Sequence, residues 1–110
     1  MSENYKIKIT KQAYAQMEVI GRYIAFELLS PETADKLLAL LKLEIASLSF
    51  MPERFTFTEE EPWHSKGVRK MPVKNYLVYY IIKEEAKEVR VTAILHARQD
   101  QQKELLNMDM

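Results

Sequence analysis

Two consecutive stripes of apolar residues at helical spacing limit the fold of this chain more than any other feature. From Lys11 to Leu29, and again from Pro31 to about Phe50, apolar side chains recur every three or four positions, as on one face of an amphipathic helix. The stripes comprise Ala13, Met17, Ile20, Ile24 and Leu28, and then Ala34, Leu37 or Leu38, Leu41, Ile45 and Leu48. Ser30 as N-cap and Pro31 at the first helical position restart the helix. We therefore predict a helical hairpin whose stripes need a second layer to cover them.

Strands are predicted on both sides of this hairpin. Before it, "YKIKIT" alternates polar and apolar residues, which is typical of a strand with one buried face, and Thr10 is placed to cap the first helix. After it come segments 68–71, 76–82 and 89–95, of which the second, "YLVYYII", is apolar on both faces and is expected at the centre of the sheet. Short turns join these three segments, so they should pair antiparallel. Residues 1–110 are thus predicted to form a single α+β domain of order β-α-α-β-β-β, with the helical hairpin on one face of a small antiparallel sheet.

The alternation along the strands predicts which side chains face the helices. Tyr79 is expected beneath the helices as core, which places Tyr76 and Tyr80 on the opposite face. In the last strand, one face carries Val89, Val91, Ala93 and Leu95, and the other carries Arg90, Thr92, Ile94 and His96. Because the helices cover only one side of the sheet, we expect the other side to stay partly open, with His96 and Arg98 pointing there.

The composition narrows the possible functions. The chain has 110 residues, with 16 basic and 16 acidic side chains and a formal net charge of zero. General nucleic-acid-binding proteins are usually basic overall, so any such contact must come from a local patch. There is no Cys, which excludes disulfides and thiolate zinc sites and suits a reducing cytosol. No apolar run approaches the roughly 20 residues that span a bilayer, and the N-terminus lacks the apolar core of a signal peptide, so we expect a cytoplasmic protein outside the membrane.

Familiar motifs for cofactors and catalysis are missing from the sequence. Two histidines, His64 and His96, without any Cys do not make a zinc ligand set. Two glycines cannot form a phosphate-binding loop, and no Ser occupies a strand-to-helix elbow of the hydrolase type. We therefore expect neither a metal nor a cofactor.

Basic residues near two of the predicted strands are the candidates for a functional site: Lys66, Arg69, Lys70 and Lys74, and then His96 and Arg98. If those strands flank the central one, the two groups approach each other. Arginine binds phosphate bidentately and histidine transfers protons near neutral pH, so Arg69, His96 and Arg98 are the candidate catalytic residues for RNA cleavage by its own 2′-hydroxyl. The candidates for binding a target or a nucleic acid are Lys66, Lys74, Tyr76 and Tyr80. The structural alternative stays open, because lysines at strand rims discourage edge pairing and an arginine can lock a strand to a loop.

The chain resembles the RelE/ParE superfamily of bacterial toxins. The resemblance covers Tyr5 to about Asp100, and it rests on the order of the elements and on "PERF", "GVRKMPVKNY", "NYLVYYII" and "ILHARQD". It implies a compact toxin of a type II toxin-antitoxin module, of the kind called plasmid stabilisation proteins. Such a toxin is encoded beside a cognate antitoxin, whose tail wraps the toxin and neutralises it.

The superfamily has two arms, and the resemblance favours the ParE-like arm. RelE-like toxins cut mRNA in the ribosomal A site, whereas ParE-like toxins poison DNA gyrase and cut nothing. Arg69 and Arg98 match the basic pattern of the RelE-like arm. Gly67 and Tyr76 stand where that pattern has further basic residues, and its C-terminal tyrosine is missing. The implied function is therefore inhibition of gyrase.

Two alternatives to gyrase inhibition stay open. One is a RelE-like, ribosome-dependent mRNA endonuclease, which His96 keeps possible because related ribonucleases of the superfamily use histidines. The other is a non-toxic relative that only binds its antitoxin and operator DNA. If the chain is a gyrase inhibitor or an mRNA endonuclease, the resemblance implies that it contacts operator DNA only through the antitoxin.

Overall fold

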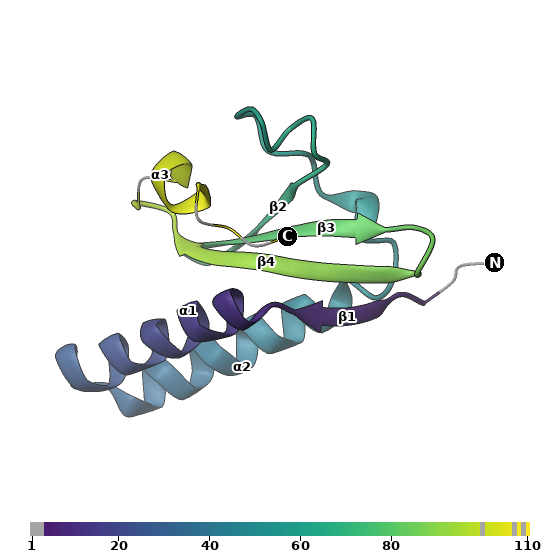
Figure 1. The fold of residues 1–110 in the computed structure, drawn as a ribbon. Coiled ribbons are helices and arrows are strands. Elements are labelled where there is room, and N and C mark those ends of the chain that lie inside the picture. The colour runs from purple at the N-terminus through teal and green to yellow at the C-terminus, as the bar shows by residue number, and fades with distance from the viewer. Residues whose placement is uncertain (1–3, 100, 107, 109) are drawn as a thin grey trace.

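The structure of the chain, a computed structural model, describes residues 4–99, 101–106, 108 and 110. Its elements are β1 (Lys6–Ile9), α1 (Lys11–Arg22), the π-helical turn η1 (Tyr23–Glu27), α2 (Pro31–Ser47), the 3₁₀ turn η2 (Pro52–Arg54), β2 (Arg69–Val73), β3 (Tyr76–Lys83), β4 (Glu88–His96) and α3 (Gln101–Leu105). This confirms the predicted α+β class and the order β-α-α-β-β-β, to which the short helix α3 is added (Figure 1). None of the helices in these residues is both long and apolar enough to cross a membrane.

Local contacts set the ends of the helical hairpin. The hydroxyl of Thr10 accepts a hydrogen bond from the N–H of Ala13 at 3.1 Å, so Thr10 caps α1 as predicted. The α-helix does not continue to Leu29, because it widens into η1, and the N–H of Ser30 then bonds to the carbonyl of Ile24 at 3.1 Å. α2 starts at the predicted proline, but the hydroxyl of Ser30 does not bond to a backbone N–H of that helix.

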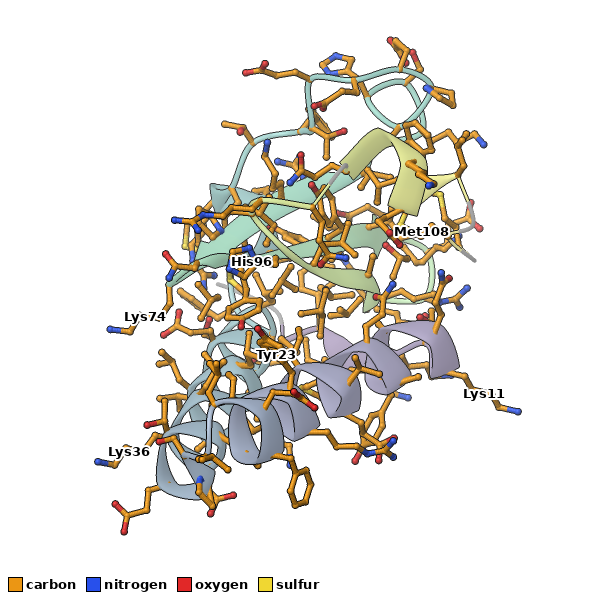
Figure 2. The ribbon with its side chains drawn as sticks, turned by 90° about the vertical axis from the view of Figure 1, so that its left-hand side faces the viewer. Lys11, Tyr23, Lys36, Lys74, His96 and Met108 are labelled. Carbon is orange, nitrogen blue, oxygen red and sulfur yellow. The ribbon has the colours of Figure 1, made fainter. Side chains whose placement is uncertain are left out.

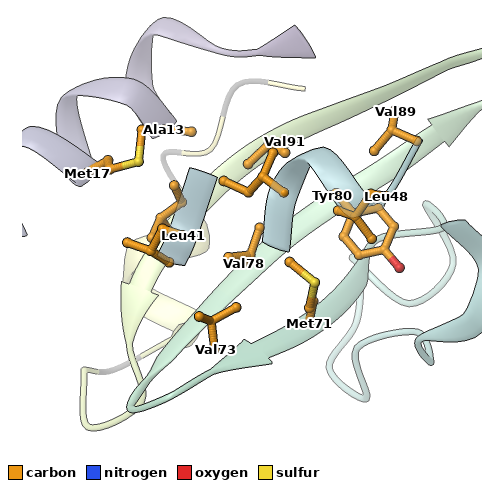
Figure 3. Close-up of a cluster of buried hydrophobic side chains, with 12 residues drawn as sticks. Ala13, Met17, Leu41, Leu48, Met71, Val73, Val78, Tyr80, Val89 and Val91 are labelled. Atoms are coloured by element: carbon orange, nitrogen blue, oxygen red, sulfur yellow. The ribbon is translucent and has the colours of Figure 1, made fainter. Parts of the chain in front are cut away.

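The four strands form one sheet in the order β1-β4-β3-β2. β2, β3 and β4 pair antiparallel as predicted, whereas β1 adds to β4 as a parallel edge strand, so the sheet is mixed. α1 and α2 cover one of its faces (Figure 1). The main core between them, shown in Figure 3, consists of Ala13, Met17, Leu41, Ile45, Leu48, Met71, Val73, Val78, Tyr80, Val89, Val91 and Ile94.

The face opposite the helical hairpin is also covered, which corrects the expectation of a partly open face. Trp63, in the loop before β2, is only 5% exposed, and Leu105 of α3 is buried as well. Both residues belong to a second cluster, together with Val68, Tyr79, Ile81, Ala93 and Leu95. α3 lies on this side of the sheet in Figure 1. The apolar character of both faces of β3 thus reflects two cores, one on each side.

The central strand β3 faces the opposite way from the prediction. Val78 and Tyr80 lie in the core under α1 and α2, and the partly buried Tyr76 packs against that core. Tyr79 lies on the other face, in the cluster that contains Trp63. The prediction was wrong because both faces of this strand are apolar, so its sequence pattern does not distinguish them.

A β-bulge in β4 also reverses the predicted facing of the end of that strand. The register shifts between Tyr79 and Tyr80, which leaves Thr92 as an extra residue in β4. As a result, Val91 and Ile94 both lie in the core under the helices, although simple alternation places them on opposite faces. Residues after the bulge therefore point to the face opposite the predicted one.

Candidate functional site

Arg69, the first residue of β2, is held by the loop that precedes the strand. Its Nη1 donates hydrogen bonds to the carbonyls of Phe55 at 2.6 Å and Glu53 at 3.1 Å. Its guanidinium carbon also lies 4.1 Å from the centre of the Phe57 ring, within the range of a cation–π contact. These contacts fix the loop to the edge of the sheet, which is the structural role left open by the sequence.

Arg69 does not approach His96, which corrects the expectation that the basic groups converge. Arg69 lies opposite Tyr80 on β3, whereas His96 lies opposite Tyr76, four residues further along the same strand. With two strand spacings added, the two Cα atoms are about 16 Å apart. Arg69 and His96 therefore lack the mutual geometry of one catalytic site.

His96 lies on the helix side of the sheet. The prediction had placed it on the opposite face and was wrong. Its ring meets the edge of the Tyr76 ring, with centroids 5.1 Å apart and an interplanar angle of 83°. The backbone N–H of Arg98 donates to Nδ1 of His96 at 3.0 Å, so Nε2 carries the hydrogen of the neutral ring. Burial raises the pKa of the neighbouring Tyr76 phenol, which keeps that ring neutral.

The turn after β4 and the β2–β3 turn meet at one end of the sheet. The N–H of Ala97 donates to the carbonyl of Asn75 at 2.8 Å, which joins the two turns. Basic residues border this end of the sheet, and we term them the cationic end: Lys36 and Lys74, which line one hollow, and His96 and Arg98, at and after the end of β4. Figure 2 shows Lys36 and Lys74 at the left of the molecule, with His96 and Tyr23 nearer its centre.

A hollow of about 460 Å³ lies at the cationic end, between α2 and the β2–β3 turn. Its apolar floor includes Leu37 and Tyr76, and both Lys36 and Lys74 line it. In the part of the chain that the structure describes, Lys36, Lys74 and Arg98 make no ion pair. The arrangement can bind an anionic or aromatic group, but it offers no paired acid and base.

Two of the predicted binding residues do not belong to this end. Tyr80 is fully buried, its hydroxyl donates to the carbonyl of Pro52 at 2.6 Å, and burial raises its pKa to about 12. Tyr80 is therefore core, which corrects its assignment to target binding. Lys66 is exposed in the loop before β2, while Lys74 and Tyr76 do lie together at the cationic end. Among the described residues no group of acidic or histidine side chains could hold a metal ion.

Sequence reasoning missed Lys36 and a set of exposed apolar residues near the tip of the helical hairpin. Val19, Tyr23 and Phe26 are exposed on α1 and η1, away from the buried stripe. Their spacing of four and three residues marks a second stripe on the same helix, and this was the signal available in the sequence. The position of Lys36 had no such signal, because it depends on how α2 meets the β2–β3 turn.

A protein family matches the sequence of this chain, and solved structures share its fold. Residues 7–101 match the family described as the ParE toxin of type II toxin-antitoxin systems, parDE. No curated protein matches the chain significantly in sequence.

Three solved structures share the fold at low identity. The chromosomal ParDE toxin-antitoxin system of P. aeruginosa is 21% identical, with a TM-score of 0.68 over 84% of this chain and 95% of that one. The RelBE2 complex of Mycobacterium tuberculosis is 18% identical, with a TM-score of 0.61 over 86% and 92%. A mutant of E. coli RelE in the free state is 14% identical, with a TM-score of 0.63 over 92% of both chains.

These matches confirm the RelE/ParE resemblance inferred from the ordered segments. The solved structures support the fold, and the family match extends over most of the chain, from β1 to the start of α3. The chain therefore belongs to the ParE toxin family of type II toxin-antitoxin systems.

Proposed function

We propose that this toxin acts by binding and inhibiting DNA gyrase, without cutting RNA, and that a cognate antitoxin neutralises it. The observation that carries the proposal is the placement of Arg69. Its Nη1 donates to the carbonyls of Phe55 and Glu53, and its guanidinium lies over the Phe57 ring. A residue engaged in this way is poorly suited to bind a scissile phosphate.

The remaining basic residues do not replace Arg69 as a catalytic set. Cleavage by the 2′-hydroxyl needs a base, an acid and cations within hydrogen-bond reach of one phosphate. His96 uses Nδ1 to accept the Arg98 N–H, which leaves only Nε2 for proton transfer. The zero net charge of the chain also differs from the strong positive field that helps a protein bind RNA. Both points favour a toxin that docks on a protein.

The proposed partners of the chain are an antitoxin and gyrase. Two of the structures with the same fold are described as a ParDE system and a RelBE2 toxin-antitoxin complex, which supports a cognate antitoxin for this chain. The exposed apolar residues near the hairpin tip and the hollow at the cationic end are surfaces on which a partner can bind. We propose that operator DNA is reached only through the antitoxin, and that the toxin acts in the cytoplasm, where gyrase and chromosome lie.

A second candidate function, ribosome-dependent cleavage of mRNA, is favoured by the cationic end. Lys74 and His96 lie near Tyr76, whose ring is half-buried and can stack on a base, and the N–H of Arg98 bonds to the His96 ring. In this reading Arg98 binds the phosphate and Nε2 of His96 moves the proton. Arg69 takes no part, which separates this version from the predicted trio.

One pair of assays decides between the two functions. Purified toxin is added to gyrase with relaxed plasmid, and separately to a translation reaction in which cleavage of a defined mRNA is mapped. We expect supercoiling to stop and the mRNA to stay intact, both with the wild type and with the His96→Gln variant. Intact supercoiling together with mRNA cleavage that Arg98→Ala abolishes would overturn the gyrase proposal. If the wild-type toxin has no effect in either assay and is harmless when expressed without an antitoxin, the non-toxic alternative is correct.

A further inference from the structure

The outer face of α1 and η1 exposes an apolar stripe that the fold does not use. Val19, Tyr23 and Phe26 are 61%, 54% and 72% exposed, and Leu29, at the tip of the hairpin, is 83% exposed. A hollow of about 300 Å³ runs along this face. It is lined by the residues that we term the outer stripe: Val19, Arg22, Tyr23, Phe26 and Glu27. Their spacing at positions i, i+3, i+4, i+7 and i+8 is that of a helix face that packs on another helix.

The apolar area of this region is large for a monomer. Five apolar side chains in this region are each more than half exposed: Val19, Tyr23, Phe26, Leu28 and Leu29. Together they leave on the order of 500 Å² of apolar surface, which is near the upper limit for the largest patch on a typical monomer. A standard interface buries about 800 Å² on each partner, of which a polar rim supplies a part. The region is therefore large enough to form the centre of a modest interface between two proteins.

The charges of the outer stripe fit a second copy of the same stripe. Arg22 and Glu27 are exposed at either side of the aromatic pair, and neither makes an ion pair within the described residues. The midpoint between them falls between Ile24 and Ala25. A two-fold axis through that point sets Arg22 against Glu27 of the partner subunit, and Glu27 against Arg22 of the partner subunit.

The same axis matches the apolar residues. Tyr23 comes to lie against Phe26 of the partner subunit, and Phe26 lies against Tyr23 of the partner subunit. Every contact occurs twice, as an isologous interface requires. Because the chain has no net charge, two copies meet without overall repulsion.

We propose that two copies of this toxin associate through the outer stripe as an antiparallel, two-fold symmetric dimer. The dimer covers the apolar stripe when the toxin is without a partner. This inference concerns the chain by itself, so it stands or falls independently of whether gyrase or the ribosome is the target.

A charge exchange tests the dimer. The mass of the purified toxin is measured by light scattering and by analytical ultracentrifugation over a range of concentrations. The wild type should approach twice the 13.0 kDa of one chain as the concentration rises. Arg22→Glu or Glu27→Arg alone should raise the dimer dissociation constant about tenfold, because each change places like charges together at two points of the interface. The double exchange should restore the wild-type constant.

The controls separate the dimer from folding and from other partners. Lys42→Glu changes an exposed charge on α2 outside the stripe and should leave the dissociation constant unchanged. Circular dichroism at a concentration at which the wild type is monomeric should show the same melting temperature for all these variants, because the changed side chains are exposed. A wild type that stays monomeric at the highest soluble concentration overturns the proposal. A double exchange that dissociates like the single variants overturns the two-fold pairing. A further variant, Phe26→Asp, tests whether the stripe binds another protein. If the wild type is monomeric and Phe26→Asp loses antitoxin binding or gyrase inhibition, the stripe serves that partner instead.

Discussion

Replacing Arg69 with alanine should weaken the fold and leave the activity of the folded toxin intact. The change removes charge-assisted hydrogen bonds to the carbonyls of Phe55 and Glu53 and the contact with the Phe57 ring. Each such hydrogen bond contributes about 1.5 to 3 kcal/mol and the ring contact about 0.5 to 1. Because the site is partly exposed and water replaces some of these contacts, we expect a net loss of about 2 to 3 kcal/mol in the free energy of unfolding. For a domain of this size that lowers the melting temperature by about 10 °C.

Urea unfolding followed by circular dichroism measures the loss, and gyrase inhibition is then compared per folded molecule. Arg69→Lys keeps the charge but not the planar fork, so it should lose a large part of the same free energy. Lys70→Ala, at the next position of β2, is the matched control and should change stability by less than about 0.5 kcal/mol. If Arg69→Ala unfolds at the wild-type urea concentration but no longer inhibits its target, Arg69 is a functional residue and the reasoning is wrong.

Three further predictions concern the core and the first helix. Tyr80→Phe removes the hydrogen bond to the Pro52 carbonyl and should lower the free energy of unfolding in urea by about 1 to 2 kcal/mol, while gyrase inhibition is kept. If inhibition is lost and stability is unchanged, Tyr80 binds the target. Burial raises the pKa of Tyr79 and Tyr80 to about 12, above the unfolded value of 10.0, so their contribution to stability is complete below pH 10 and is lost as the pH rises towards 12. The free energy of unfolding should fall by about 2 to 3 kcal/mol per tyrosine. Thermal melts measured across this pH range should show the fall, and a melting temperature that does not change with pH would contradict it. Thr10→Ala removes the cap on the Ala13 N–H and should cost about 1 kcal/mol, with faster hydrogen exchange in the first turn of α1; unchanged exchange would argue against the cap.

The order of the elements could be predicted because local patterns determine it. Helical spacing marks the two helices, the polar–apolar alternation of "YKIKIT" marks β1, and Thr10 and Pro31 mark two helix starts, all of which the structure confirms. The end of α1 could not be predicted in this way. The apolar spacing continues through η1 to Leu28, whereas the change to a π-helical turn depends on how the chain closes towards α2.

The facing of the strands could not be read from the sequence, because long-range contacts decide it. Thr92 occurs in a regular alternation with no glycine to indicate a bulge. Its hydroxyl donates to the carbonyl of Tyr79, and its own carbonyl accepts from the hydroxyl of Thr10, 82 residues away in the chain. These contacts bring three separate segments together. The position of His96, beyond the bulge, therefore depended on information that its own strand does not contain.

The matches of Arg69 and Arg98 to the RelE-like pattern show why residue identity is a weak guide to a catalytic site. Each arginine is present, but the "PERF" loop supplies the Phe55 carbonyl that holds the guanidinium of Arg69. To bind phosphate through Nη1, Arg69 must first release that loop, at a cost of about 2 to 3 kcal/mol as argued above. Such a cost weakens phosphate binding through this nitrogen by about 30- to 150-fold, which is a large penalty for a site that must hold a transition state. If the chain is a nuclease, we therefore expect Arg69 not to be one of its catalytic residues. A comparison of the toxicity of Arg69→Ala with that of Arg98→Ala tests this point directly.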